Sequence, residues 1–153
     1  MSKSAIELDA EASELEARAL QLRRDAASRR DRDREVARLE AAKIPVDRSA
    51  RTLVDGSPVT KDHRELKPNG QQKDYVVLSE AERAKGFVRP VRRSYIHTKC
   101  GVLTTMSQAI AETYARDPYF YSGTFCCGCG SHFPVGDDGE FTWADAPNEK
   151  VGT

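Results

Sequence analysis

Two short stretches with the same form place the strongest constraint on the fold of this chain. Residues 97–101 read HTKCG and residues 126–130 read CCGCG, so each offers a metal ligand, two further residues, a cysteine and a glycine. Two ligands at this spacing can reach one ion from a single turn, and the glycine allows the left-handed backbone that the turn needs. Paired knuckles of this kind build closed tetrahedral zinc sites in small domains.

The shared form favours one set of four zinc ligands over its neighbours in the sequence. This set comprises His97, Cys100, Cys126 and Cys129. His132 lies three residues after Cys129 and is the alternative to His97 as the fourth ligand. Cys127 fits the same ion poorly, because only one residue separates it from Cys129, and we expect it to be a buried or half-buried free thiol.

The zinc expected here is structural rather than catalytic. Enough ligands lie nearby to close the coordination shell, whereas a catalytic zinc keeps one position open for water or substrate. The sequence lacks the His-Glu-x-x-His and His-x-Glu…Cys-x-x-Cys patterns of zinc proteases and deaminases. It also lacks a phosphate-binding P-loop, a dinucleotide fingerprint and a Gly-x-Ser-x-Gly elbow, so we do not expect an enzyme.

Composition limits how much of the chain can form one core. Hydrophobic residues make up 39% and charged residues 31% of the sequence, which is poor in apolar side chains for a globular domain. The formal net charge is zero and points to neither nucleic acid nor membrane. No apolar run suits a membrane span or a signal peptide, so a cytoplasmic location is expected. In that reducing compartment four cysteines favour metal over disulfides.

Residues 1–43 are predicted to form one long helix, because they contain neither glycine nor proline and Pro45 follows them. Leu8, Leu15 and Leu22 recur every seven residues, which is typical of a coiled-coil seam. The second row of that seam consists of Ala5, Ala12, Ala19 and Ala26. The first half of the helix is acidic and the second half is rich in arginine, an order that would let two copies pair antiparallel. We therefore expect a homo-oligomer or another protein partner to bind through residues 5–39.

Residues 44–74 are predicted to be a flexible linker, since prolines, glycines and polar residues interrupt any regular period. Residues 75–153 are expected to form the folded domain. It begins with a short strand at 75–78 and a helix of about two turns that Ser79 caps and Gly86 ends. Residues 87–96 are predicted to be extended, and Pro90 favours the edge of a sheet.

The second half of the domain has its own helix and hairpin signals. A capping box starting at Thr105 predicts a helix with Met106, Ile110 and Tyr114 on one face. Residues 133–135 and 141–143 flank a turn sequence and predict a β-hairpin, with aromatic side chains that form a core under the metal. The tail, residues 144–153, is expected to be polar and loose.

A group of basic residues before and within the first knuckle supports an alternative function. It consists of Arg83, Lys85, Arg89, Arg92, Arg93 and Lys99. If these side chains shared one face, that face would attract phosphate groups. The alternative is therefore a zinc-finger protein that binds nucleic acid or modulates transcription.

Five segments of the second half carry a resemblance to a known family. They are residues 86–97 (GFVRPVRRSYIH), 100–106 (CGVLTTM), 110–118 (IAETYARDP), 124–129 (TFCCGC) and 132–135 (HFPV). Together they resemble a family of small uncharacterised zinc-finger-like proteins of tailed bacteriophages and prophages. The resemblance covers residues 74–153 and leaves the N-terminal helix outside. It implies a phage setting, expression in the cytoplasm of a bacterial host and metal binding, but no activity, and His132 lies inside a matching segment.

The sequence thus predicts an α+β protein with three parts: a long helix or coiled coil (1–43), a flexible linker (44–74) and a small zinc-ribbon-like domain (75–153). The expected function is that of a non-enzymatic, zinc-binding protein-interaction module.

Overall fold

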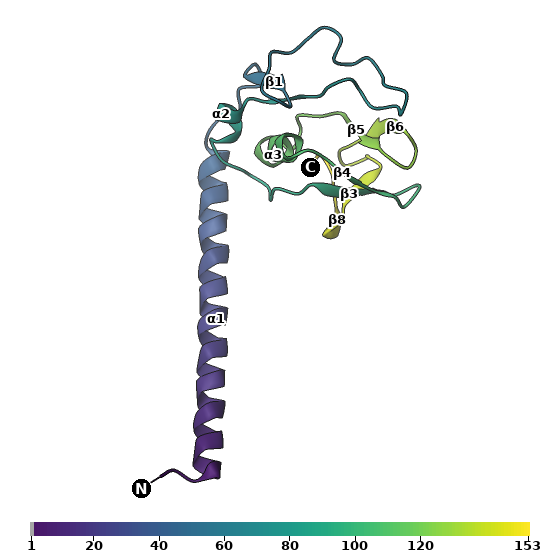
Figure 1. The fold of residues 1–153 in the computed structure, drawn as a ribbon. Helices are drawn as coiled ribbons and strands as arrows, with labels where there is room; N and C mark the ends of the chain where they lie inside the picture. The colour runs from purple at the N-terminus through teal and green to yellow at the C-terminus, as the bar shows by residue number, and fades with distance from the viewer. Residues whose placement is uncertain (1) are drawn as a thin grey trace. The chain divides into compact units, whose positions relative to one another are not determined.

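The computed structural model describes residues 2–153, which divide into two compact units with a boundary between Ala37 and Arg38 (Figure 1). The α+β class is confirmed: long and short helices are followed by a small β-rich region. The long helix α1 runs over Ala5–Ala42, close to the predicted range. Ser4 and Glu7 form a reciprocal capping box at its start, with Ser4 N donating to Glu7 Oε2 at 2.7 Å and Glu7 N to Ser4 Oγ at 3.3 Å.

The leucines of the proposed seam lie on the surface of α1. Leu8, Leu15 and Leu22 are 53%, 62% and 57% exposed in the single chain. A helix with such side chains in water gains little stability from its own sequence, so the coiled coil stays a prediction that needs a second chain.

Residues 44–74 differ from the expected flexible linker, because they belong to the second compact unit. Strand β1 (Arg51–Leu53) pairs antiparallel with β2 (Val76–Leu78), and Leu53 is buried. Further along, Lys73 N donates to Glu65 O at 2.7 Å, and a β-bridge joins Leu66 to Gln72. Backbone hydrogen bonds order this segment, and such short pairings leave no periodicity in a sequence.

Two sheets flank the knuckles (Figure 1). One has four antiparallel strands in the order β4-β3-β7-β8, with bounds Leu103–Thr105, Ser94–His97, Phe141–Trp143 and Ala146–Lys150. The other consists of β5 (Gly123–Cys126) paired with β6 (Ser131–Pro134). Strand β3 is central rather than at an edge, because Pro90 lies before the strand and removes no ladder hydrogen bond from it.

The predicted hairpin between residues 133–135 and 141–143 is wrong. The chain does turn there, with Gly139 N donating to Gly136 O at 2.9 Å. However, β6 pairs with β5, while β7 pairs with β3 and β8. The tail is not loose either: it forms β8, and Val151 is fully buried. Alternating aromatic residues identified the strands, but the pattern could not specify their partners.

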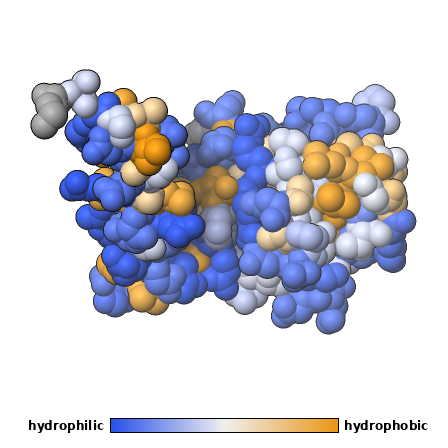
Figure 2. All heavy atoms as spheres, turned by 90° about the horizontal axis from the view of Figure 1, so that it is seen from below, coloured by the Kyte–Doolittle hydropathy of each residue, from blue (hydrophilic) through white to orange (hydrophobic). Residues whose placement is uncertain are grey.

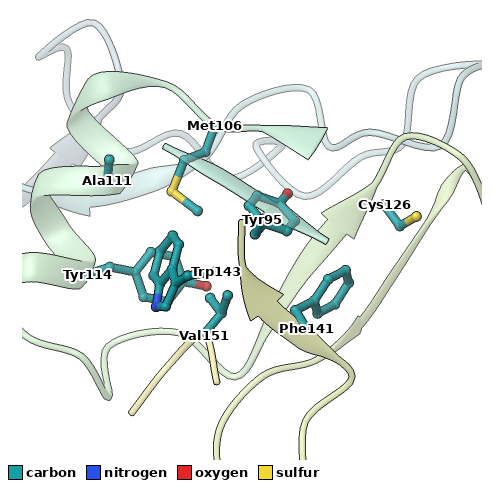
Figure 3. Packing of buried hydrophobic residues seen from close by; sticks show 8 residues of the cluster. All are labelled: Tyr95, Met106, Ala111, Tyr114, Cys126, Phe141, Trp143 and Val151. Carbon is teal, nitrogen blue, oxygen red and sulfur yellow. The ribbon is translucent and has the colours of Figure 1, made fainter. Parts of the chain in front are cut away.

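The short helices cover the core. Helix α2 (Glu80–Arg83) is capped by Ser79, as predicted, but is shorter than two turns. Helix α3 (Gln108–Arg116) is capped by Ser107 rather than Thr105, because Thr105 pairs with Ser94 in the sheet. The cluster in Figure 3 packs α3 against both sheets, and its members are Tyr95, Met106, Ala111, Tyr114, Cys126, Phe141, Trp143 and Val151.

A buried arginine ties the start of the second unit to α3. The Arg116 side chain is 1% exposed and donates to Ala41 O at 3.1 Å and to Ile44 O at 2.9 Å. Ala41 O also accepts from Ile44 N at 3.1 Å, whereas Ile44 O lies just beyond α1 and takes its hydrogen bond from Arg116. A cation at this end of the helix suits the helix dipole. Glu82, also buried, lies 3.7 Å from the guanidinium and balances its charge; the pKa of Glu82 is lowered by Lys85 and, to a smaller extent, by Arg116.

Replacing Arg116 should therefore be strongly destabilising. We expect Arg116→Met to lower the free energy of unfolding by roughly 2–4 kcal/mol, because the carbonyls of Ile44 and Pro45 would lose their hydrogen bonds and Glu82 would lose one of its cations. Urea unfolding followed by Trp143 fluorescence measures the change. The control is Arg64→Met at an exposed position, which should stay within about 0.5 kcal/mol of the wild type. Equal effects of the two substitutions would contradict this role for Arg116.

Candidate metal centre

The two knuckles have the same backbone geometry, as their shared sequence form predicts. The first connects β3 to β4, and the second connects β5 to β6. In each, the glycine N–H donates to the carbonyl of the first ligand at 2.8 Å: Gly101 to His97 and Gly130 to Cys126. Both glycines have positive φ, 75° and 64°, a conformation that a residue with a Cβ rarely adopts.

These turns bring together the four side chains that the sequence favoured. The ligand atoms of His97, Cys100, Cys126 and Cys129 all lie within 4.8 Å of one another, so the cluster could hold a metal ion. The Sγ atoms of Cys100 and Cys126 are 3.5 Å apart, and Cys129 Sγ is 3.5 Å from His97 Nδ1. In a tetrahedral zinc site, bond lengths imply S–S separations of about 3.8 Å and S–N separations of about 3.5 Å. The two distances thus fit a tetrahedral ion with three sulfur ligands and one nitrogen.

The imidazole of His97 is held in the orientation that a ligand requires. Its Nδ1 faces Cys129, and its Nε2 lies 3.2 Å from Glu140 Oε1. Lys99 Nζ lies 2.9 Å from the same oxygen. The pKa of Glu140 is lowered, first by the hydrogen bond from Lys99 and then by that from His97, so the group is a carboxylate. A carboxylate that accepts from the outer nitrogen of a histidine fixes the tautomer and makes the inner nitrogen a better ligand.

Aromatic rings from β7 and from β6 of the other sheet lie beside His97. The Phe133 ring stacks on the imidazole at a centroid distance of 4.5 Å, and the Phe141 ring stacks at 4.8 Å. His97 is 2% exposed, so its ring has no room to turn. The spacing of residues in the sequence gave no sign of Glu140 or of this ring packing. Glu140 directly precedes β7, and the two rings lie on β6 and β7, so they reach His97 only through the pairing and packing of the strands.

The thiols influence one another through burial and hydrogen bonding. Burial and hydrogen bonds from the other two thiols raise the pKa of Cys129 to about 11, whereas a backbone hydrogen bond at Val102 lowers the pKa of Cys100. Cys129 N donates to Cys126 Sγ at 3.4 Å. A divalent cation would favour all three thiolates, so binding should release protons and weaken in acid.

The alternative ligand His132 lies outside the cluster. Its Nε2 is 2.9 Å from the hydroxyl of Tyr75, and its ring packs beside Phe125 on the two-stranded sheet. Burial lowers the pKa of His132, which keeps it neutral. Cys127 is a free thiol, as expected, but it is exposed rather than buried, and its Sγ lies 3.3 Å from both Thr104 Oγ1 and Leu103 O instead of the ligand atoms. The structure therefore places His97, not His132, with the three cysteines.

The six basic residues do not form a free cationic face. Four are paired with carboxylates: Arg83 with Glu112, Lys85 with Glu82, Arg92 with Glu149 and Lys99 with Glu140. The other two donate to backbone carbonyls: Arg89 to Thr153 and Val88, and Arg93 to Met106. Because each cation already has an acceptor in the fold, the arrangement offers phosphate groups much less than the sequence suggested.

No family model, curated protein or solved structure matches the chain. Within residues 2–153, no helix combines the length and the apolar character needed to cross a membrane.

The contact between Glu140 and His97 can be tested through metal affinity. We expect Glu140→Gln to weaken zinc binding by about tenfold, because the neutral amide supports the imidazole less well. The measurement is a competition titration against a zinc chelator. Asp138→Asn, an exposed position in the same turn, is the matched control and should leave the affinity unchanged. Equal affinities for all three proteins would show that Glu140 does not assist the ligand.

Proposed function

We propose that this chain is a non-enzymatic, zinc-binding protein in which a structural zinc ion holds two sheets together. The observation that carries the proposal is the origin of the four ligands. His97 and Cys100 come from the four-stranded sheet and its first turn, whereas Cys126 and Cys129 come from the two-stranded sheet. A single ion bound to all four would cross-link sheets that share no strand pairing among the described residues.

The donor set supports a structural rather than a catalytic ion. Three thiolates and one imidazole complete a tetrahedral shell and leave no position for water or substrate. Such a set also favours zinc over magnesium or calcium, which prefer oxygen ligands. The chain's own residues would hold and orient the ion, and the ion would supply folding free energy instead of reaction chemistry.

We further propose that α1 makes the protein an interaction module by pairing with a second copy of itself. The seam leucines are exposed in the single chain, and the face in Figure 2 shows apolar patches among hydrophilic surface. Acidic residues alone provide the charge of residues 5–17, while arginines outnumber acids over 18–38. An antiparallel pair would set each acidic half against a basic half. The phage setting is part of this proposal and rests on the resemblance of residues 74–153.

Metal analysis of purified protein tests the zinc centre. We expect one zinc per wild-type chain and close to none in Cys100→Ser or Cys129→Ser, since three ligands bind a structural zinc much more weakly. Cys127→Ser and His132→Asn are the matched controls, because they change the same residue types beside the cluster without removing a proposed ligand. Full zinc content in a double variant lacking both Cys100 and Cys129 would refute the site.

Sedimentation velocity of the full chain tests the pairing of α1. We expect a dimer for the wild type and a monomer for Leu8/Leu15/Leu22→Gln, which removes the apolar seam while keeping good helix formers. The control Ile6/Leu20→Gln changes exposed apolar residues outside the seam and should remain a dimer. A wild-type protein that sediments as a monomer at every concentration would disprove self-association.

A further inference from the structure

A cavity of ≈ 280 Å³ lies in the second unit, separate from the metal ligands. Four tyrosines contribute to its wall: Tyr75, Tyr95, Tyr114 and Tyr121. On one side it is bounded by the polar segment 67–74, which includes exposed residues, so the cavity opens to solvent there. Neither the zinc centre nor α1 makes use of this space.

Hydrogen bonding distinguishes one of the four tyrosines. Tyr95 donates to Phe125 O at 2.5 Å, Tyr121 donates to Val76 O at 2.7 Å, and the hydroxyl of Tyr75 lies 2.9 Å from His132 Nε2. The hydroxyl of Tyr114 is buried and has no hydrogen-bond partner among residues 2–153. A buried hydroxyl without a partner is unfavourable, so in a native protein it indicates a group that is satisfied by something else.

Tyr114 belongs to the wall of the cavity. Tyr114 is 3% exposed and lines the space together with Thr124. Burial raises the pKa of Tyr114 well above its ordinary value. The nearby Thr124 hydroxyl lowers the pKa to a smaller extent, but the two hydroxyls do not meet the geometry of a hydrogen bond. The Thr124 hydroxyl itself donates to Tyr95 at 3.1 Å. Tyr114 therefore keeps its proton and has it available for an acceptor that enters the cavity.

The remaining wall favours a flat, apolar body. Met106, Ile110 and Phe125 line the cavity beside the tyrosine rings. Aromatic rings and a methionine sulfur attract the faces and edges of another aromatic ring more strongly than they attract an aliphatic chain. A volume of ≈ 280 Å³ holds a molecule with one or two fused rings.

We propose that this cavity binds a planar aromatic small molecule that carries a hydrogen-bond acceptor, with Tyr114 as the donor and the tyrosine-lined wall as the contact for the rings. Lys67, Lys73 and Asp74 line the open side of the cavity, and Lys73 is paired with Asp62. Because Lys67 makes no ion pair among the described residues, that side can accept an anionic group such as a carboxylate. The inference goes beyond the proposed structural zinc and does not depend on it.

The sequence offers a selective probe, because it contains only Met1 and Met106. We would label the methionine methyl groups of the full-length, zinc-loaded protein with ¹³C and titrate it with 2-naphthoate, a planar aromatic carboxylate. The Met106 methyl lies in the wall and should shift in a saturable way, whereas the Met1 methyl should not move. Cyclohexanecarboxylate has the same acceptor without the planar rings and should bind much more weakly. No saturable shift of Met106 up to about 5 mM 2-naphthoate, which is the weak end of specific affinity, would overturn the proposal.

Two variants locate the binding contacts. Tyr114→Phe keeps the ring contacts with Trp143 and Tyr121 but removes the donor, and should raise the Kd about three- to tenfold. Tyr119→Phe is the matched control at an exposed ring and should leave the Kd unchanged. Ile110→Phe should fill the cavity and weaken binding further. Unchanged affinity in both Tyr114→Phe and Ile110→Phe would place the probe elsewhere and refute the site, and zinc analysis of the same samples separates this result from loss of metal.

Discussion

The convergence of four donor atoms from two turns is the constraint on which the β-rich half depends. The sheet β4-β3-β7-β8 and the pair β5-β6 have no strand pairing with each other. Side-chain contacts join them near the knuckles, such as Tyr95 to Phe125 O and the Cys127 amide to Thr104 Oγ1 at 3.1 Å. These contacts are directional and hold only if the two turns keep their places. Because both turns meet at the ligand cluster, an ion there would fix the relation between the sheets and, through it, the hydrophobic core.

A second interaction orders the part of the chain before the β-rich half. Arg116 at the end of α3 donates hydrogen bonds to backbone carbonyls of residues 41–45, and Glu82 balances its charge. The segment that follows then crosses the domain and reaches the second knuckle, where a Cβ on Gly70 would lie 1.9 Å from Gly130 O. Polar contacts hold the start of residues 44–74, a close backbone approach lies near their end, and Leu53 is the buried apolar side chain between them. This explains how a segment with the composition of a linker becomes part of a compact unit.

The sequence predicted what depends on local spacing and missed what depends on distant partners. The repeated knuckle form selected the four clustered side chains, and the absence of glycine and proline located α1. The wrong hairpin arose because alternation identifies a strand but not its neighbour. Glu140, Arg116 and the ordered course of residues 44–74 act through contacts between residues far apart in the chain. The basic residues before the first knuckle appeared available for phosphate in the sequence for the same reason. Arg83 forms its ion pair with Glu112, and Arg92 with Glu149, only in the folded protein.

Wall residues of the tyrosine-lined cavity lie beside the second knuckle, although no metal ligand itself lines the cavity. Thr104 lines the cavity and also accepts from the backbone of Cys127, while Tyr95 and Phe125 join the cavity to the strand that ends at Cys126. A closed zinc shell has no open position for chemistry, so its contribution would be to hold these wall residues in a fixed geometry. A preformed cavity lowers the conformational entropy lost when a small ligand binds. In the two proposals together, the metal centre would supply rigidity and the space beside it would supply recognition.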